Sequence, residues 1–367
     1  MQAATRRGRG TAPHWGLLSA SAVLAGALAA CGSAAGQTPA AASGTASQSP
    51  LAGKTITLIV AGGAGATADL ETRAIAPYLA QYLKATVHVE DMPGGGGLKG
   101  WNYVAAAKPN GLILGSGNIQ GMIANVWEKV PGQNFNPAQL TWLGGLAGGR
   151  GGGAKIMFAN PKTLPFTSMA NLVASKQPIK ELGAVGDVSG PLFFKAYQVP
   201  YQDLTDYADA NQQKVALLRG DGQVSVKYYA GWDSVVKAGQ VIPIFDFTLR
   251  PKWSLHPNVE TLGTFLKQHP PADPGAKTAL ELDAAALDAG YGYYGPPGIP
   301  KNIATALAAA FKAAIENPQF VSHAKQIKIS YYYTSPAQEE AAISSALTPS
   351  HIQLMRKYVP LSNGVAS

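Results

Sequence analysis

The sequence predicts an α/β protein with mostly parallel sheets, flanking helices and enough chain for two domains. An apolar, β-branched run at 55–60 is bounded by glycine, which is typical of a strand covered on both faces. Strand-like and helix-like patterns alternate after it, as they do where helices connect parallel strands. Beyond an N-terminal region of unusual composition, roughly 315 residues remain, which suits two domains.

The first 30 residues have the features of a secretory signal peptide. Three arginines and no acidic residue accompany an apolar stretch from Trp15 to Ala30 that is too short to span a bilayer comfortably. The run Leu28-Ala29-Ala30-Cys31 resembles the lipobox of bacterial lipoproteins, which implies a lipid on Cys31 and a lipoprotein signal peptide at 1–30. Two alternatives stay open: a chance cysteine in an ordinary signal peptide, and twin-arginine export through Arg6-Arg7.

Residues 31–50 are almost all Ala, Ser, Thr, Gly, Gln and Pro, so we expect a disordered tether. The folded part then begins near Leu51 and contains no cysteine, which excludes disulfides and thiolate metal sites there. The formal net charge of +8 includes three arginines of the signal peptide, so the mature chain carries 8 − 3 = +5. No basic run is interleaved with aromatic residues, and we expect no nucleic-acid binding.

A strand, a glycine-rich turn and a helix at 55–83 predict an anion site. Glycines after the strand allow the backbone to turn, and Thr67 or Asp69 can cap the helix that follows. Unpaired N–H groups and the positive end of the helix dipole then point the same way. The residues expected to offer these groups are Gly63, Ala64, Gly65, Ala66 and Thr67.

Two more strands follow, at 86–90 and 112–114, with a helix between them at about 98–107. Ligands of parallel sheets bind beyond the carboxyl ends of the strands. Ser116 and Asn118, which follow the third strand, are therefore expected to form a second wall of the same site.

Eight segments in order along the chain carry a resemblance to one family: Ile59 to Arg73, Val89 to Gly97, Ala107 to Gly111, Val199 to Tyr201, Leu218 to Val224, Lys237 to Gly239, His256 to Thr261 and Gly295 to Pro300. They resemble the substrate-binding receptors of tripartite tricarboxylate transporters, the Bug receptors, and they extend over essentially the whole mature chain. The resemblance implies a two-lobed periplasmic-binding-protein fold of type II with the ligand cleft between the lobes. It places one lobe at 51–156 and 290–367 and the other at 157–289.

The resemblance also implies that the second lobe holds the other end of the ligand. Its loop at 183–190 contains Gly186 and Asp187, and Ser189 can donate a hydroxyl group. Asp187 would repel an anionic ligand unless it points away or meets an ammonium group. Lys227 and Tyr228 lie where the family has another cleft segment and can supply charge and stacking.

The function implied is that of an extracytoplasmic receptor, anchored at the periplasmic side of a membrane or at the cell surface. A monomer would capture a small organic anion, with a carboxylate as the default, and pass it to a membrane permease, without catalysis or a cofactor. The six histidines lack the spacing of metal ligands, so no metal site is expected. One alternative has the same fold: a ligand-sensing partner of a membrane histidine kinase.

A dinucleotide-binding oxidoreductase is the other alternative. Gly63-x-Gly65-x-x-Ala68 after a strand satisfies the dinucleotide pattern, and Glu90 or Asp91 could bind the ribose. An exported protein, however, meets no pool of nicotinamide cofactor, which argues against this alternative.

Overall fold

The described part of the chain begins after the predicted signal peptide and most of the tether. The computed structural model describes residues 49–148, 155–164, 166, 168–184, 186–207, 209–253, 255–326 and 331–359. The predicted signal peptide at 1–30, the lipid site Cys31 and all but the last two residues of the tether at 31–50 lie outside these residues. Within them, no helix is long and apolar enough to cross a membrane.

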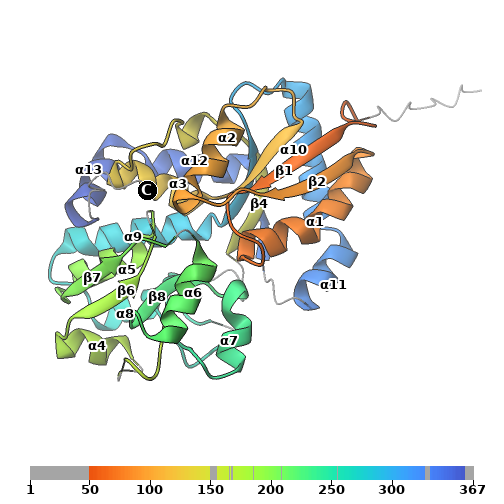
Figure 1. The fold of residues 1–367 in the computed structure, drawn as a ribbon. Coiled ribbons are helices and arrows are strands. Elements are labelled where there is room, and N and C mark those ends of the chain that lie inside the picture. Colours follow the sequence, from red (N-terminus) through yellow and green to blue (C-terminus); the bar gives the residue numbers. More distant parts are fainter. Residues whose placement is uncertain are drawn as a thin grey trace, which may run out of the picture. The chain divides into compact units, whose positions relative to one another are not determined.

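Two six-stranded sheets with flanking helices make up the described chain (Figure 1). In spatial order the first sheet consists of β12 (Tyr331–Thr334), β4 (Thr141–Gly148), β11 (Tyr291–Gly295), β3 (Ile113–Asn118), β1 (Thr55–Val60) and β2 (Thr86–Asp91). The second consists of β10 (Glu260–Thr261), β9 (Ile242–Asp246), β5 (Lys155–Ala159), β8 (Val224–Tyr228), β6 (Ile179–Leu182) and β7 (Tyr201–Leu204). The predicted α/β fold with two sheets is confirmed.

Both sheets are mixed, whereas the sequence predicted mostly parallel ones. In the first sheet β1 is parallel to β2 and β3, but β11 is antiparallel to β3 and β4, and β12 is antiparallel to β4. In the second sheet β5 is antiparallel to β8 and β9. The antiparallel strands β4, β5 and β11 are those where the chain leaves one sheet and returns to it, so no helical crossover forces them to be parallel.

Helices cover both faces of the first sheet, and the strands are correspondingly apolar on both sides. Ile56 and Leu58 of β1 pack into one core cluster and Ile59 into another, as the two-residue period of a strand requires. One side is covered by α1 (Thr67–Leu83), α10 (Lys301–Ile315) and α11 (Pro318–Gln326). The other is covered by α2 (Leu98–Ala105), α3 (Ile119–Glu128), α9 (Pro274–Asp288), α12 (Pro336–Ala346) and α13 (Pro349–Tyr358).

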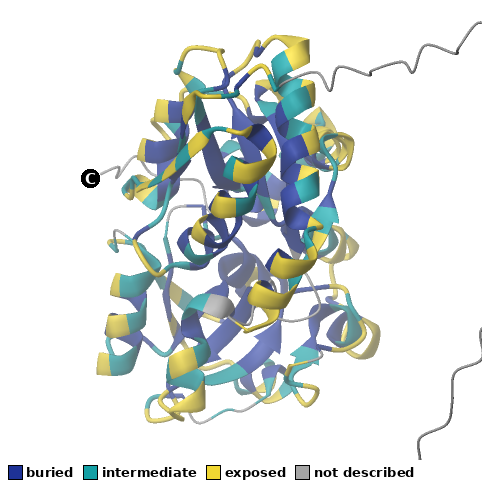
Figure 2. Ribbon diagram, turned by 90° about the vertical axis from the view of Figure 1, so that its right-hand side faces the viewer, coloured by how far each residue is buried: buried dark blue, intermediate teal, exposed yellow. Residues whose placement is uncertain are grey.

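The second sheet is also covered on both faces. Met157 and Ala159 of β5 face one cluster, while Ile156 and Phe158 face another that includes Trp232. The surrounding helices are α4 (Met169–Ser175), α5 (Ser189–Ala196), α6 (Ala210–Arg219), α7 (Asp233–Lys237) and α8 (Leu262–Gln268), and short 3-10 turns lie at η1 (Gly95–Gly97), η2 (Pro137–Gln139) and η3 (Ala230–Trp232). Figure 2 shows the inner strands dark, because they are buried, and the outer turns of the helices exposed.

The chain passes between the sheets twice. β5 already belongs to the second sheet at Lys155, and β11 belongs to the first from Tyr291. These points lie within two residues of the predicted crossings near 156 and 289. The division into a lobe at 51–156 and 290–367 and a lobe at 157–289 stays a prediction about which parts move together.

Candidate functional site

A cavity of about 150 Å³ lies at the carboxyl ends of parallel strands from both sheets. β1 and β3 lead to it from the first sheet and β6 and β8 from the second, which is where ligands of open α/β sheets bind. A cavity of about this volume accommodates one benzene-sized molecule. Its wall includes nine of the residues predicted from the sequence: Gly63, Ala66, Thr67, Ser116, Asn118, Gly186, Asp187, Lys227 and Tyr228.

The loop after β1 forms the first wall, and part of its hydrogen-bonding capacity is used internally. Gly65 has a φ of 78°, a conformation that glycine adopts readily, and its N–H donates to Asp69 Oδ2 over 2.8 Å. The Ala66 N–H donates to the Gly63 carbonyl oxygen over 3.1 Å. Fewer N–H groups are therefore left for a ligand than the glycine pattern predicts.

Helix α1 begins without a side-chain cap, so the prediction that Thr67 or Asp69 caps it is wrong. Ala66 occupies the N-cap position. Asp69 binds the preceding loop instead, and the Thr67 hydroxyl oxygen accepts a hydrogen bond from the Gly231 N–H over 3.2 Å. Because Gly231 follows β8, this hydrogen bond joins loops of the two sheets across the cavity.

Ser116 and Asn118 belong to a strand rather than to the loop that the sequence predicted. β3 continues to Asn118 because it stays paired with β11 along this stretch. The Tyr228 hydroxyl donates to Asn118 Oδ1 over 3.1 Å, and the ring centroids of Tyr228 and Tyr291 lie 5.0 Å apart. This side of the cavity therefore combines amide and hydroxyl groups with aromatic faces.

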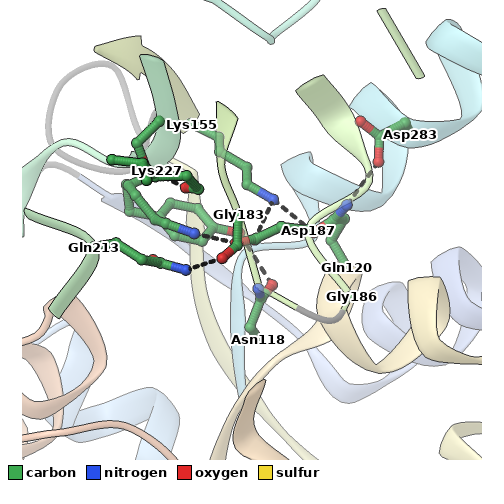
Figure 3. Close-up of polar contacts among 12 residues, drawn as sticks. Asn118, Gln120, Lys155, Gly183, Gly186, Asp187, Gln213, Lys227 and Asp283 are labelled. Atoms are coloured by element: carbon green, nitrogen blue, oxygen red, sulfur yellow. Dashed lines mark hydrogen bonds and ion pairs between the residues drawn. The ribbon is translucent and has the colours of Figure 1, made fainter. Parts of the chain in front are cut away.

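Two lysines share one aspartate on the second wall (Figure 3). Lys155 Nζ lies 3.3 Å from Asp187 Oδ1, and Lys227 Nζ contacts Asp187 Oδ2. Lys155 also donates to Gln120 Oε1 over 3.1 Å, and Gln120 donates to Asp283 Oδ1 over 2.7 Å. The repulsion that Asp187 would exert on an anion is thus offset by two ammonium groups, and the trio carries a formal charge of +1.

Burial disfavours the charged forms of the carboxyl groups around this trio, Asp203 and Asp283 included. Burial raises the pKa of Asp187, but the ammonium groups of Lys227 and Lys155 outweigh it and hold this pKa below the ordinary value. Burial raises the pKa of Glu128 to about 8, although a hydrogen bond from the Gly186 N–H opposes the shift. Burial and the charges of Asp203 and Asp187 raise the pKa of Glu181 well above its usual value. Burial therefore disfavours the charged forms of Glu128 and Glu181, whereas the two lysines favour the charged form of Asp187.

Several residues of the wall were not predicted from the sequence. One of them is Lys155. The only sequence feature that could have identified it is its position directly before the apolar run 156–159. Asp209, Asn211 and Lys214 reach the cavity from the start of α6. Asn211 Nδ2 donates to the Ala64 carbonyl oxygen over 2.9 Å, which makes a second hydrogen bond across the cavity, between the start of α6 and the loop after β1.

The comparisons with known proteins identify the fold. No family model and no curated protein matches the sequence. Among solved structures, a Rhodopseudomonas palustris protein with adipate aligns with a TM-score of 0.66 at 20% identity, over 84% of this chain and 99% of that chain. MatC from R. palustris with bound malate gives 0.65 at 17%, over 83% and 98%. The periplasmic binding protein BugD gives 0.63 at 18%, over 83% and 97%.

This chain has the fold of a periplasmic solute-binding protein. The fold that the resemblance to Bug receptors implied is thereby confirmed, including the two α/β sheets with their flanking helices. Two of the neighbours are named as binding proteins, namely BugD and a TctC solute-binding protein from Polaromonas.

Three predicted residues of this solute-binding fold lie away from the cavity wall. Gly65 and Ala64 belong to the loop after β1, but their polar groups bond to Asp69 and Asn211. Ser189 is the first residue of α5, is 1% exposed and lies beside Asp283 behind the wall. Here it is placed to support the wall, whereas the sequence predicted contact with the ligand.

The dinucleotide alternative does not fit the geometry of the sheet or of the cavity. Antiparallel β11 and β4 lie beside β3, so the sheet lacks the strand order of a dinucleotide-binding domain. A cavity of about 150 Å³ is also far smaller than a dinucleotide. Asp91, a candidate for binding the ribose, instead pairs with Arg73 over 2.5 Å.

Proposed function

We propose that this protein is an extracytoplasmic receptor that captures a small organic anion, with a carboxylate as its charged group, in the cavity between the two sheets. The observation that carries the proposal is the pair Lys155 and Lys227, which share the carboxylate of Asp187 in a small cavity. A ligand carboxylate there replaces water with charge-assisted hydrogen bonds. The malate and adipate bound by proteins of the same fold support this ligand class.

We propose further that the ligand is passed to a membrane permease of the tripartite tricarboxylate type. A signal peptide at 1–30 and a lipid on Cys31 would keep a monomeric receptor at the membrane through the tether at 31–50. Closure of the lobes at 51–156 with 290–367 and at 157–289 would exclude water from the ligand. The hydrogen bonds from Gly231 to Thr67 and from Asn211 to Ala64 support this closure, because they join loops of both sheets.

Small organic acids are expected to raise the melting temperature of the purified protein after unfolding and refolding have removed any bound ligand. A ligand that binds only the native state at roughly 100 times its Kd adds about 2.7 kcal/mol, which corresponds to a shift of about 5 °C. The screen compares mono-, di- and tricarboxylates, amino acids and aromatic acids with NAD. Stabilisation by NAD and by no acid would contradict the proposed function.

A further inference from the structure

Asp209 is a second carboxylate on the cavity wall, and its surroundings differ from those of Asp187. It is the N-cap of α6, and its Oδ1 accepts hydrogen bonds from the N–H groups of Asn211 and Gln212, both over 2.9 Å. Its Oδ2 faces the loop after β1, because a methyl group built on Gly63 would lie 2.6 Å from that atom. Oδ1 thus caps the helix, and Oδ2 lies beside Gly63, which lines the cavity together with Asp209.

The charge of Asp209 interacts with that of Lys214, but no basic side chain of the described residues contacts Asp209 as two lysines contact Asp187. Among the residues described, no basic side chain forms an ion pair with Asp209. Lys214 is the basic neighbour on the same helix, but its Nζ donates to Asn211 Oδ1 over 3.4 Å and lies 5.9 Å from the Trp232 ring centroid. Within the described part of the chain, Asp209 Oδ2 thus has no ion-pair partner.

The loop facing Asp209 is also a weaker anion site than its glycines suggest. The N–H groups of Gly65 and Ala66 are engaged within the loop, and the Gly231 backbone lies against Thr67 at the start of α1. A ligand carboxylate at this end would meet Asp209 with few free donors to compensate. The opposite end, with Lys155 and Lys227, carries the formal excess of positive charge.

We propose that the ligand is an amino-carboxylate, whose carboxylate binds Lys155 and Lys227 and whose ammonium group binds Asp209 Oδ2. The inference rests on the proposed receptor function and specifies the ligand class within it. A cavity of about 150 Å³ restricts this class to small amino acids. The lysine pair on one side and the Asp209 carboxylate on the other also fix the orientation of the ligand, since the reversed orientation brings its ammonium group to the lysines and its carboxylate to Asp209.

Calorimetric titration with matched ligands tests this assignment. Aspartate is compared with malate, and 4-aminobutyrate with 4-hydroxybutyrate, because within each pair an ammonium group replaces a hydroxyl. In the wild-type protein at least one amino acid is expected to bind about tenfold or more tighter than its hydroxy counterpart, which is the scale of a charge-assisted hydrogen bond. Asp209→Asn is expected to reduce that preference to within about twofold.

The control variant is Asp206→Asn, which neutralises an exposed aspartate shortly before α6 and is expected to keep the preference. Asparagine caps helices as well as aspartate does, so Asp209→Asn should fold, and its melting curve checks this. Equal binding within both pairs in the wild type, or an unchanged preference in Asp209→Asn, would overturn the inference and leave the receptor function standing. Failure of every acid to bind the wild type would contradict both.

Discussion

Lys155→Met is expected to weaken carboxylate binding by about 100-fold, since a buried charge-assisted hydrogen bond contributes up to about 3 kcal/mol. The side chain is 1% exposed, so water cannot replace the lost ammonium group. Methionine keeps most of the apolar stem and limits the damage to packing. Asp187 retains Lys227, and we therefore expect a loss of only about 2 kcal/mol in the free energy of unfolding.

Isothermal titration of the acid that most stabilises the wild type, together with urea denaturation, separates the two effects of this variant. Lys162→Met is the matched control, because Lys162 follows the same strand and is exposed. It should change affinity by less than about twofold and stability by less than about 0.5 kcal/mol. Wild-type affinity in a folded Lys155→Met protein would show that the lysine pair does not hold the ligand.

Glu71→Gln is expected to make the protein less sensitive to rising pH. Glu71 lies in α1 with its side chain buried, and Oε2 has no hydrogen-bond partner among the described residues. Burial raises the pKa of this carboxyl to about 8, whereas the unfolded chain has a value near 4.5. Between these values the native state keeps a proton that the unfolded state has lost, so Glu71 stabilises the protein below about pH 4.5 and this contribution disappears towards pH 8.

The variant replaces the protonated carboxyl with a neutral amide of nearly the same shape. The two proteins should have similar free energies of unfolding near pH 5, and the variant should be more stable at pH 8 by about 4 kcal/mol, since each pKa unit corresponds to 1.36 kcal/mol. Glu128 also has a pKa of about 8, so some pH dependence remains in both proteins.

Urea denaturation at each pH measures this difference, with exposed Glu340→Gln as the control that should follow the wild type. Parallel stability curves for Glu71→Gln and the wild type would mean that Glu71 is already ionised in the native state.

Local patterns predicted the part of the site that is continuous in sequence. The strand at 55–60 and the helix behind it follow from apolar runs and glycine spacing, and both are present. Of the three glycines expected to turn the backbone with positive φ, Gly65 does so, whereas Gly62 and Gly63 do not. The resemblance to a family supplied the second sheet and the loop at 183–190. The end of β3 was missed because its glycines are not typical of a strand. They are held in the strand by pairing with β11, which lies far along the chain.

The charge arrangement of the cavity could not be predicted, because it depends on strand pairing. Lys155 reaches Asp187 and Lys227 because β5 pairs antiparallel with β8, which sets Lys155 opposite Tyr228 and Ile156 opposite Lys227. The register between two strands so far apart in the chain cannot be predicted from a single sequence. Asp209 was missed for a similar reason, since a helix N-cap reveals its contact with Gly63 only when the two sheets are in place.

A crystal structure of the protein with its most stabilising acid would locate the charged group of the ligand. We expect the acid inside the cavity, with a carboxylate oxygen about 3 Å from Nζ of Lys155 or Lys227. An acid bound outside the cavity, or inside it with its carboxylate away from both lysines, would contradict a receptor site built on the lysine pair.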